Sequence, residues 1–119
     1  MNLPSRAPTS LHETDLVNTL LPQAVRTLQN DFTLSNIDCD LTDFTGDVFA
    51  LRERLIPIIS STNGPGSEAF YRLLYRVDVP ESQVAEAIQK AGDEPIMRII
   101  SELLIIRALQ KAYYRLKFT

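Results

Sequence analysis

A run of acidic residues is the first part of the chain whose side chains could bind a hard cation. Aspartates occupy positions 38, 40, 43 and 47, and a calcium loop needs several oxygen ligands close together. The register does not fit such a loop: counted from Asp38, Asp43 stands where glycine is needed and Phe49 where a bidentate glutamate is needed. We therefore expect capping and turn residues on a solvated loop, with no bound metal or other cofactor.

Nucleophilic or acid–base catalysis would depend on Cys39 and His12, since the chain has one residue of each type. Cys39 lies between two aspartates, whose negative charge opposes formation of the thiolate that a nucleophile requires. His12 lies near the N-terminus, so we expect neither a histidine-dependent triad nor a multi-histidine metal site within one chain. The sequence predicts no catalytic residue, and we expect a protein that is not an enzyme.

Two features keep a small-ligand or anion-binding domain open as the alternative function. The segment Asn63–Ser67 leads into a helix N-terminus, where backbone N–H groups attract anions, but it lacks the ending of a phosphate-binding loop and Glu68 would repel a phosphate. Arg107 extends an apolar line of the last helix, so its guanidinium needs either a carboxylate partner or an anionic ligand. A structural ion pair is the favoured interpretation of Arg107.

Tyrosines and arginines form a candidate surface for protein contacts. Two pairs occur at i, i+4 spacing opposite the apolar stripe of one short helix: Tyr71 with Tyr75 and Arg72 with Arg76. Both residue types combine a large contact area with directional hydrogen bonding, which is typical of interfaces. The alternative is that the rings cover neighbouring helices while the arginines pair with surface acids.

Composition limits the classes of partner. The chain has 119 residues, 45% of them hydrophobic, and a formal net charge of −3, so it suits one domain and has no general attraction to nucleic acid or anionic lipid. Its most apolar segment, 96–109, is interrupted by charges and is shorter than the roughly 20 residues that span a bilayer. A single cysteine permits no internal disulfide. We expect a cytoplasmic protein without nucleic-acid or membrane partners.

Helical spacing runs through the whole chain, and no segment alternates apolar and polar residues over the length of a strand. Residues 1–9 are expected to form a loose arm. Ser10 and Glu13 form a capping-box signature for a first helix that reaches about residue 32. Pro22 either kinks this helix or separates two helices.

A second helix is predicted for residues 47–56, after an irregular connection at 33–46. Asp47 begins it, and Pro57 disfavours helical backbone at the residue before it and so marks its end. The segment 60–66 is rich in turn formers and predicts a loop.

Three further helices are predicted in close succession. Ser67 caps the first of them, whose apolar stripe has the full i, i+3, i+4, i+7 spacing from Phe70 to Val77. Asp78 and Asp93 are the predicted N-caps of the next two helices. The connections between the three are so short that the helices must be neighbours in space.

The last helix, over residues 95–118, would be about 36 Å long and should cross the molecule. Apolar residues cover most of its first half: Ile96, Ile99, Ile100, Leu103, Leu104 and Ile106. In its second half the side that was apolar carries Arg107, Gln110, Lys111 and Arg115, while the side that was polar carries Ile105, Leu109, Ala112, Tyr113 and Leu116. The second apolar side is covered either by earlier helices of the same chain or by a partner, for which a second copy is the commonest choice.

Two strings, YRLLYRVDVPE at 71–81 and LLIIRALQK at 103–111, resemble a group of small bacterial proteins that have no established activity. The resemblance covers about the last 50 residues and consists mostly of helix caps and apolar spacing. It implies a bacterial helical domain and no catalytic residue.

The sequence therefore predicts one all-α domain, a bundle of four or five helices with a long central C-terminal helix. The expected function is contact with a protein partner, including a homodimer, through the Tyr71–Arg76 side of the short third helix or the C-terminal half of the last helix.

Overall fold

The computed structural model describes residues 3–62, 64 and 66–118, and these form five helices and no strand. The predicted all-α bundle is confirmed. Its helices, in chain order, are α1 (Thr14–Leu34), α2 (Val48–Ser60), α3 (Glu68–Val77), α4 (Glu81–Lys90) and α5 (Ile96–Lys117).

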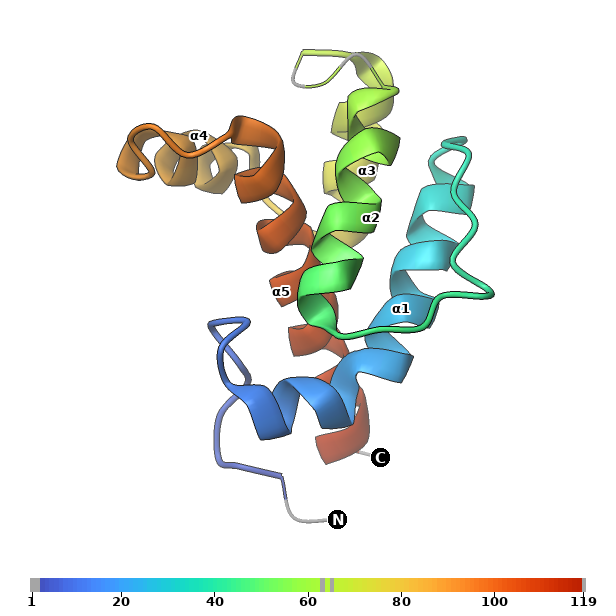
Figure 1. The fold of residues 1–119 in the computed structure, drawn as a ribbon, viewed down its shortest axis with the longest axis vertical. Helices are drawn as coiled ribbons and strands as arrows, with labels where there is room; N and C mark the ends of the chain where they lie inside the picture. The colour runs from blue at the N-terminus through green and yellow to red at the C-terminus, as the bar shows by residue number, and fades with distance from the viewer. Residues whose placement is uncertain (1–2, 63, 65, 119) are drawn as a thin grey trace.

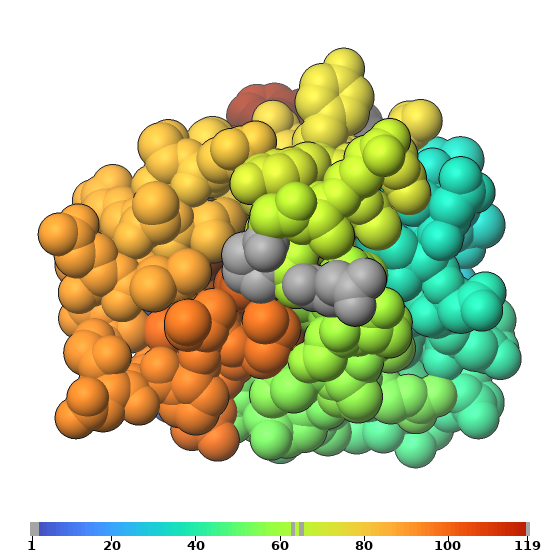
Figure 2. All heavy atoms as spheres, turned by 90° about the horizontal axis from the view of Figure 1, so that it is seen from above, coloured from blue at the N-terminus to red at the C-terminus, as the bar shows by residue number. Residues whose placement is uncertain are grey.

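The long C-terminal helix is the centre of the bundle, as predicted, because each of the other four helices packs against it (Figure 1). The contacts of α1 and α2 with α5 are the most extensive. Seen end-on, α4 and the C-terminal end of α1 lie on opposite sides of the molecule, with α2 and α3 between them (Figure 2). Helix α4 is peripheral, since Val84 is its one fully buried residue. No described helix is long and apolar enough to cross a membrane.

Pro22 kinks one helix and does not separate two. Helix α1 continues from Thr14 to Leu34, and its direction changes sharply along its length (Figure 1). Proline has no N–H to donate to the carbonyl of Asn18, and its ring crowds that carbonyl, which is the usual cause of a sharp bend. Both halves bury apolar side chains, among them Leu20 before the bend and Leu28 after it.

Helix α2 continues through Pro57 to Ser60, so the predicted end at Ile56 is wrong. Pro57 lies on the exposed side of the helix, where water can reach the carbonyl that loses its partner. The extra turn buries Ile59 completely. The free energy gained by this burial outweighs the preference of Ile56, the residue before the proline, for a non-helical backbone. At its other end the predicted cap is confirmed, because the Asp47 carboxylate accepts a 2.9 Å hydrogen bond from the Ala50 N–H.

The predicted N-caps of α4 and α5 are also wrong. Pro80 and Pro95 occupy these positions in extended backbone, and both helices begin one residue later. Asp78 instead ends α3 in the left-handed conformation, with φ of 67°. By contrast the Ser67 cap of α3 is confirmed, since its hydroxyl accepts a 3.2 Å hydrogen bond from the Phe70 N–H.

The N-terminal arm is packed against α5, where we expected a loose segment. The Tyr113 hydroxyl donates to the Pro4 carbonyl at 2.5 Å, and the Gln110 amide donates to the Pro8 carbonyl at 3.0 Å. Ala7, which lies between Pro4 and Pro8 in the sequence, is buried. Residues 1 and 2 lie outside the described part of the chain.

Only the Glu13 half of the predicted capping box forms. Helix α1 begins at Thr14 and not directly after Ser10. The Glu13 carboxylate accepts hydrogen bonds from the backbone N–H groups of Thr9 and Ser10, at 2.7 and 2.9 Å. These bonds lower the pKa of Glu13 and fix the turn by which the arm enters the helix.

Candidate functional site

Ile105, Leu109 and Tyr113 of α5 are buried within the chain, so this part of the predicted interaction surface is wrong. Ile105 and Leu109 are 0% exposed and Tyr113 is 1% exposed, all covered by their own chain. Helix α1 packs along α5, and the N-terminal arm lies over the end that carries Tyr113. The two apolar sides of α5 are thus buried by different parts of the same molecule.

The tyrosine–arginine face, which we define as Tyr71, Arg72, Tyr75 and Arg76, lies on the outside of α3. Tyr71 is 42% exposed and Tyr75 84% exposed, while the opposite side of this helix is buried in the core. Leu34, the last residue of α1, is also exposed and lines one open groove of about 630 Å³ together with this face. The predicted placement of the four residues on one exposed face is therefore confirmed.

The two arginines of this face differ in their contacts. The Arg72 guanidinium lies 3.3 Å from the Glu68 carboxylate and donates two 3.4 Å hydrogen bonds to the Ser35 carbonyl at the end of α1. Arg76 forms no ion pair with a carboxylate of the described residues. Arg72 is therefore held between two helices, whereas the charge of Arg76 is available beside Tyr75.

Arg107 forms the structural ion pair that the sequence favoured. Its guanidinium lies 2.7 Å from the Asp78 carboxylate and also donates to the Gln110 side chain at 3.4 Å. Hydrogen bonding and the charge of Arg107 lower the pKa of Asp78. The pair joins α5 to the turn between α3 and α4. Because the Asp78 side chain is 70% exposed, the pair itself contributes less than about 1 kcal/mol to stability.

Substitutions at Asp78 should separate backbone strain from charge pairing. Asp78→Ala keeps the left-handed backbone and loses the ion pair, so we expect the free energy of unfolding to fall by about 1–2 kcal/mol. Asp78→Gly also loses the pair but adopts this conformation without strain, so we expect it to remain within about 1 kcal/mol of wild type. Urea denaturation measures both values. An alanine variant as stable as the glycine variant would contradict the role of strain.

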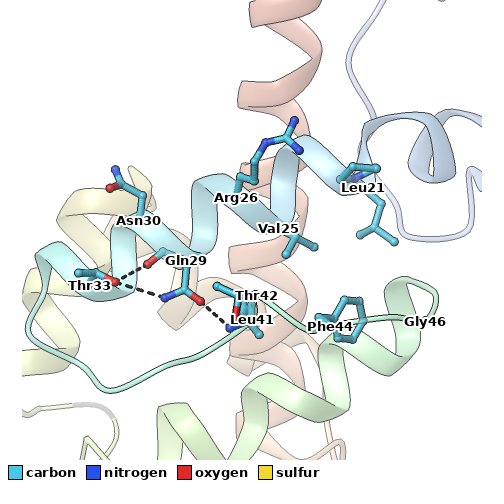
Figure 3. A pocket seen from close by; sticks show the side chains of 11 residues that line it. Leu21, Val25, Arg26, Gln29, Asn30, Thr33, Leu41, Thr42, Phe44 and Gly46 are labelled. Atoms are coloured by element: carbon cyan, nitrogen blue, oxygen red, sulfur yellow. Dashed lines mark hydrogen bonds between the residues drawn. The ribbon is translucent and has the colours of Figure 1, made fainter.

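A second groove, of about 500 Å³, lies between the C-terminal half of α1 and the segment 41–46 (Figure 3). Leu21 and Val25 point from α1 toward that segment, which brings Phe44 to the other side. Gln29 fixes the two walls together: its amide donates to the Cys39 carbonyl at 2.6 Å and accepts from the Leu41 N–H at 2.5 Å. Gln29 was not among the residues singled out from the sequence, because no local pattern indicates that a glutamine inside a helix binds the backbone ten residues later.

A third groove, of about 820 Å³, lies between α1 and α5, and we call it the cationic groove. Arg107, Lys111 and Arg115 line it from α5 and Arg26 lines it from α1. The pattern of the last helix placed Arg107, Lys111 and Arg115 on one side of it, but it did not predict a groove, because only the packing of the two helices brings Arg26 opposite.

Asp31 is the one acidic residue that lines the cationic groove. It is 8% exposed and forms an ion pair with Lys111 at 3.5 Å. One of its carboxylate oxygens is buried without a hydrogen-bond partner. Burial raises the pKa of Asp31, and the nearby charges of Lys111, Arg76 and Arg115 oppose this shift.

The other sequence candidates have local structural roles. Within the described residues no group of three or more metal-binding side chains comes together, and the Asp40 carboxylate accepts hydrogen bonds from Thr42. Burial raises the pKa of the Cys39 thiol to about 11, with Asp40 contributing in the same direction. His12 is exposed, with its ring 5.2 Å from that of Phe49.

Gly64 and Ser67, which belong to the expected anion loop, make local hydrogen bonds. The Gly64 N–H donates to the Thr62 hydroxyl at 3.3 Å, and the Ser67 hydroxyl donates to the Gly64 carbonyl at 3.0 Å. Asn63 and Pro65, which belong to the same predicted loop, lie outside the described residues.

Comparison of the chain with protein-family models, with curated proteins and with solved structures finds no match. The resemblance to bacterial helical proteins therefore stays a prediction.

Proposed function

We propose that the protein acts through protein–protein contacts and that the tyrosine–arginine face of α3 binds the partner. The observation that carries this proposal is the 84% exposure of Tyr75 on a helix whose other side is packed into the core. Tyrosine and arginine are enriched among the residues that dominate binding energy. Burial raises the pKa of the Cys39 thiol to about 11, which opposes its use as a nucleophile. The single cysteine favours a cytoplasmic place of action.

The chemistry of the face favours an acidic protein segment that also carries an apolar side chain. Arg76 offers a cation without a carboxylate partner in the described structure, and Arg72 shares its charge with the exposed Glu68. Leu34 and the two tyrosine rings provide the apolar part of the same open groove. Complementary charge would set the orientation and association rate of such a partner.

Selection from a displayed library of random peptides tests this proposal. The intact protein is the target, and the double variant Tyr75→Ala, Arg76→Ala is used for counter-selection. We expect enriched peptides to combine carboxylates with a large apolar residue. A synthetic copy of an enriched peptide should lose at least about tenfold in affinity on Tyr75→Ala, since a central tyrosine contributes on the order of 2 kcal/mol.

The control is Gln89→Ala, an exposed position on α4, which should leave peptide affinity within about twofold of wild type. Peptides that bind wild type and the double variant equally well would overturn the proposal, and so would a selection without enrichment.

A further inference from the structure

We propose that the cationic groove between α1 and α5 is a binding site for a small polyanion with two or more linked phosphate groups. This site is separate from the tyrosine–arginine face and does not depend on the function proposed above. It gives the alternative of an anion-binding domain a definite place, which is the groove lined by Arg107 and not the Gly64–Ser67 loop.

The cationic groove has a local excess of positive charge. The whole chain has a formal net charge of −3, yet four cations and a single acid, Asp31, line this groove. Two of the cations are neutralised, Arg107 by Asp78 and Lys111 by Asp31. Neither Arg26 nor Arg115 forms an ion pair with a carboxylate of the described residues. The groove therefore has more positive charge than the protein itself compensates.

The cations lie on both walls of the groove. Arg107, Lys111 and Arg115 follow each other at i, i+4 spacing and so form one row along α5, with about 6 Å between successive positions. Arg26 faces this row from α1. A single anionic group can contact one part of such a row, whereas linked phosphates can contact several cations at once. Guanidinium groups suit phosphate because they donate two parallel hydrogen bonds.

Two cations of the α5 wall are held in position by contacts within the protein. The Lys111 side chain is 23% exposed, and its ammonium group donates to the Arg76 carbonyl at 2.9 Å besides pairing with Asp31. Arg107 is likewise held by Asp78 and Gln110. Two cations are thus oriented before a ligand arrives, which reduces the entropy lost on binding. The negative charge of Asp31 repels any anion. A ligand with one negative charge therefore gains less binding free energy from the groove than a ligand with several.

Isothermal titration calorimetry with inorganic orthophosphate, pyrophosphate and tripolyphosphate tests the proposal on the intact protein. We expect one saturable site, with affinity increasing from orthophosphate to tripolyphosphate and falling as salt is added. Arg26→Gln and Arg115→Gln should each weaken tripolyphosphate binding about tenfold, because each removes a charge-assisted contact. Asp31→Asn should strengthen binding several-fold, since it removes the one negative charge of the groove.

Arg54→Gln is the matched control, because it removes the same charge from an exposed position on α2. It should stay within about twofold of wild type, and Tyr75→Ala should do the same, which separates this proposal from the function of the tyrosine–arginine face. Equal weakening by Arg54→Gln would show a general charge effect and overturn the site. Titrations without saturation, or orthophosphate binding as tightly as tripolyphosphate, would overturn it as well. Arg26 is exposed, so its variant tests the site even where a change at Asp31 impairs folding.

Discussion

Leu109→Ala is expected to lower the free energy of unfolding by about 2–5 kcal/mol and to leave the mass of the particle in solution unchanged. Leu109 is 0% exposed and lies on the side of α5 that is covered by its own chain. Truncation leaves a cavity that the surrounding helices close only in part. Urea denaturation followed by circular dichroism measures the first effect, and size-exclusion chromatography with light scattering measures the second.

Leu34→Ala is the matched control for this variant, because it removes the same atoms from a side chain that is 48% exposed. It should cost less than about 1 kcal/mol. A loss below this value at Leu109, together with a fall in particle mass, would contradict the conclusion that this side of α5 is buried within one chain.

Gln29→Ala is expected to lower the free energy of unfolding by about 1–3 kcal/mol. The amide of Gln29 makes two hydrogen bonds to the backbone of the connection that follows α1, one with Cys39 and one with Leu41. Its removal leaves a carbonyl and an N–H without these partners in a partly buried place. Hydrogen exchange at the Leu41 amide provides a local readout, and this amide should lose its protection first.

Release of the same connection should also expose Cys39, which is half-buried in the native protein. We expect a thiol reagent to modify Gln29→Ala faster than wild type at the same pH. Gln23→Ala is the control, since the Gln23 side chain accepts a hydrogen bond from Arg26 of the same helix. An unchanged exchange rate at Leu41 would show that the connection is held by other contacts.

Local patterns predicted the elements whose stabilising partners lie within a few residues. The apolar stripe from Phe70 to Val77 is fully buried, and the caps at Asp47 and Ser67 form as expected. Each of these depends on i, i+3 or i+4 neighbours, which a sequence displays directly.

The errors occur where burial or a distant partner overrides a local preference. Pro57 did not end α2, because the turn beyond it buries Ile59. Asp78 lies at the end of α3, where its partner Arg107 is 29 residues away along the chain. No local pattern indicates either fact.

The candidate binding surfaces could likewise be predicted only where they depend on residues of one helix. Four residues of one helix, 71, 72, 75 and 76, could be placed on an exposed face from their spacing alone. The periodicity of α5 showed that it has two apolar sides but not which part of the chain covers the second. The cationic groove required knowledge that Arg26 of α1 packs opposite the row of cations on α5.

The bond between Tyr113 and Pro4 joins residues that are 109 positions apart, and α1 likewise packs on α5. During translation the arm and the first helix therefore leave the ribosome long before the helix that will cover them. The apolar side chains that α5 covers lack this cover until α5 has emerged, although α1 also packs on α2 and α3, which are synthesised earlier. The native packing of α1 and of the N-terminal arm on α5 can therefore form only after α5 has been synthesised.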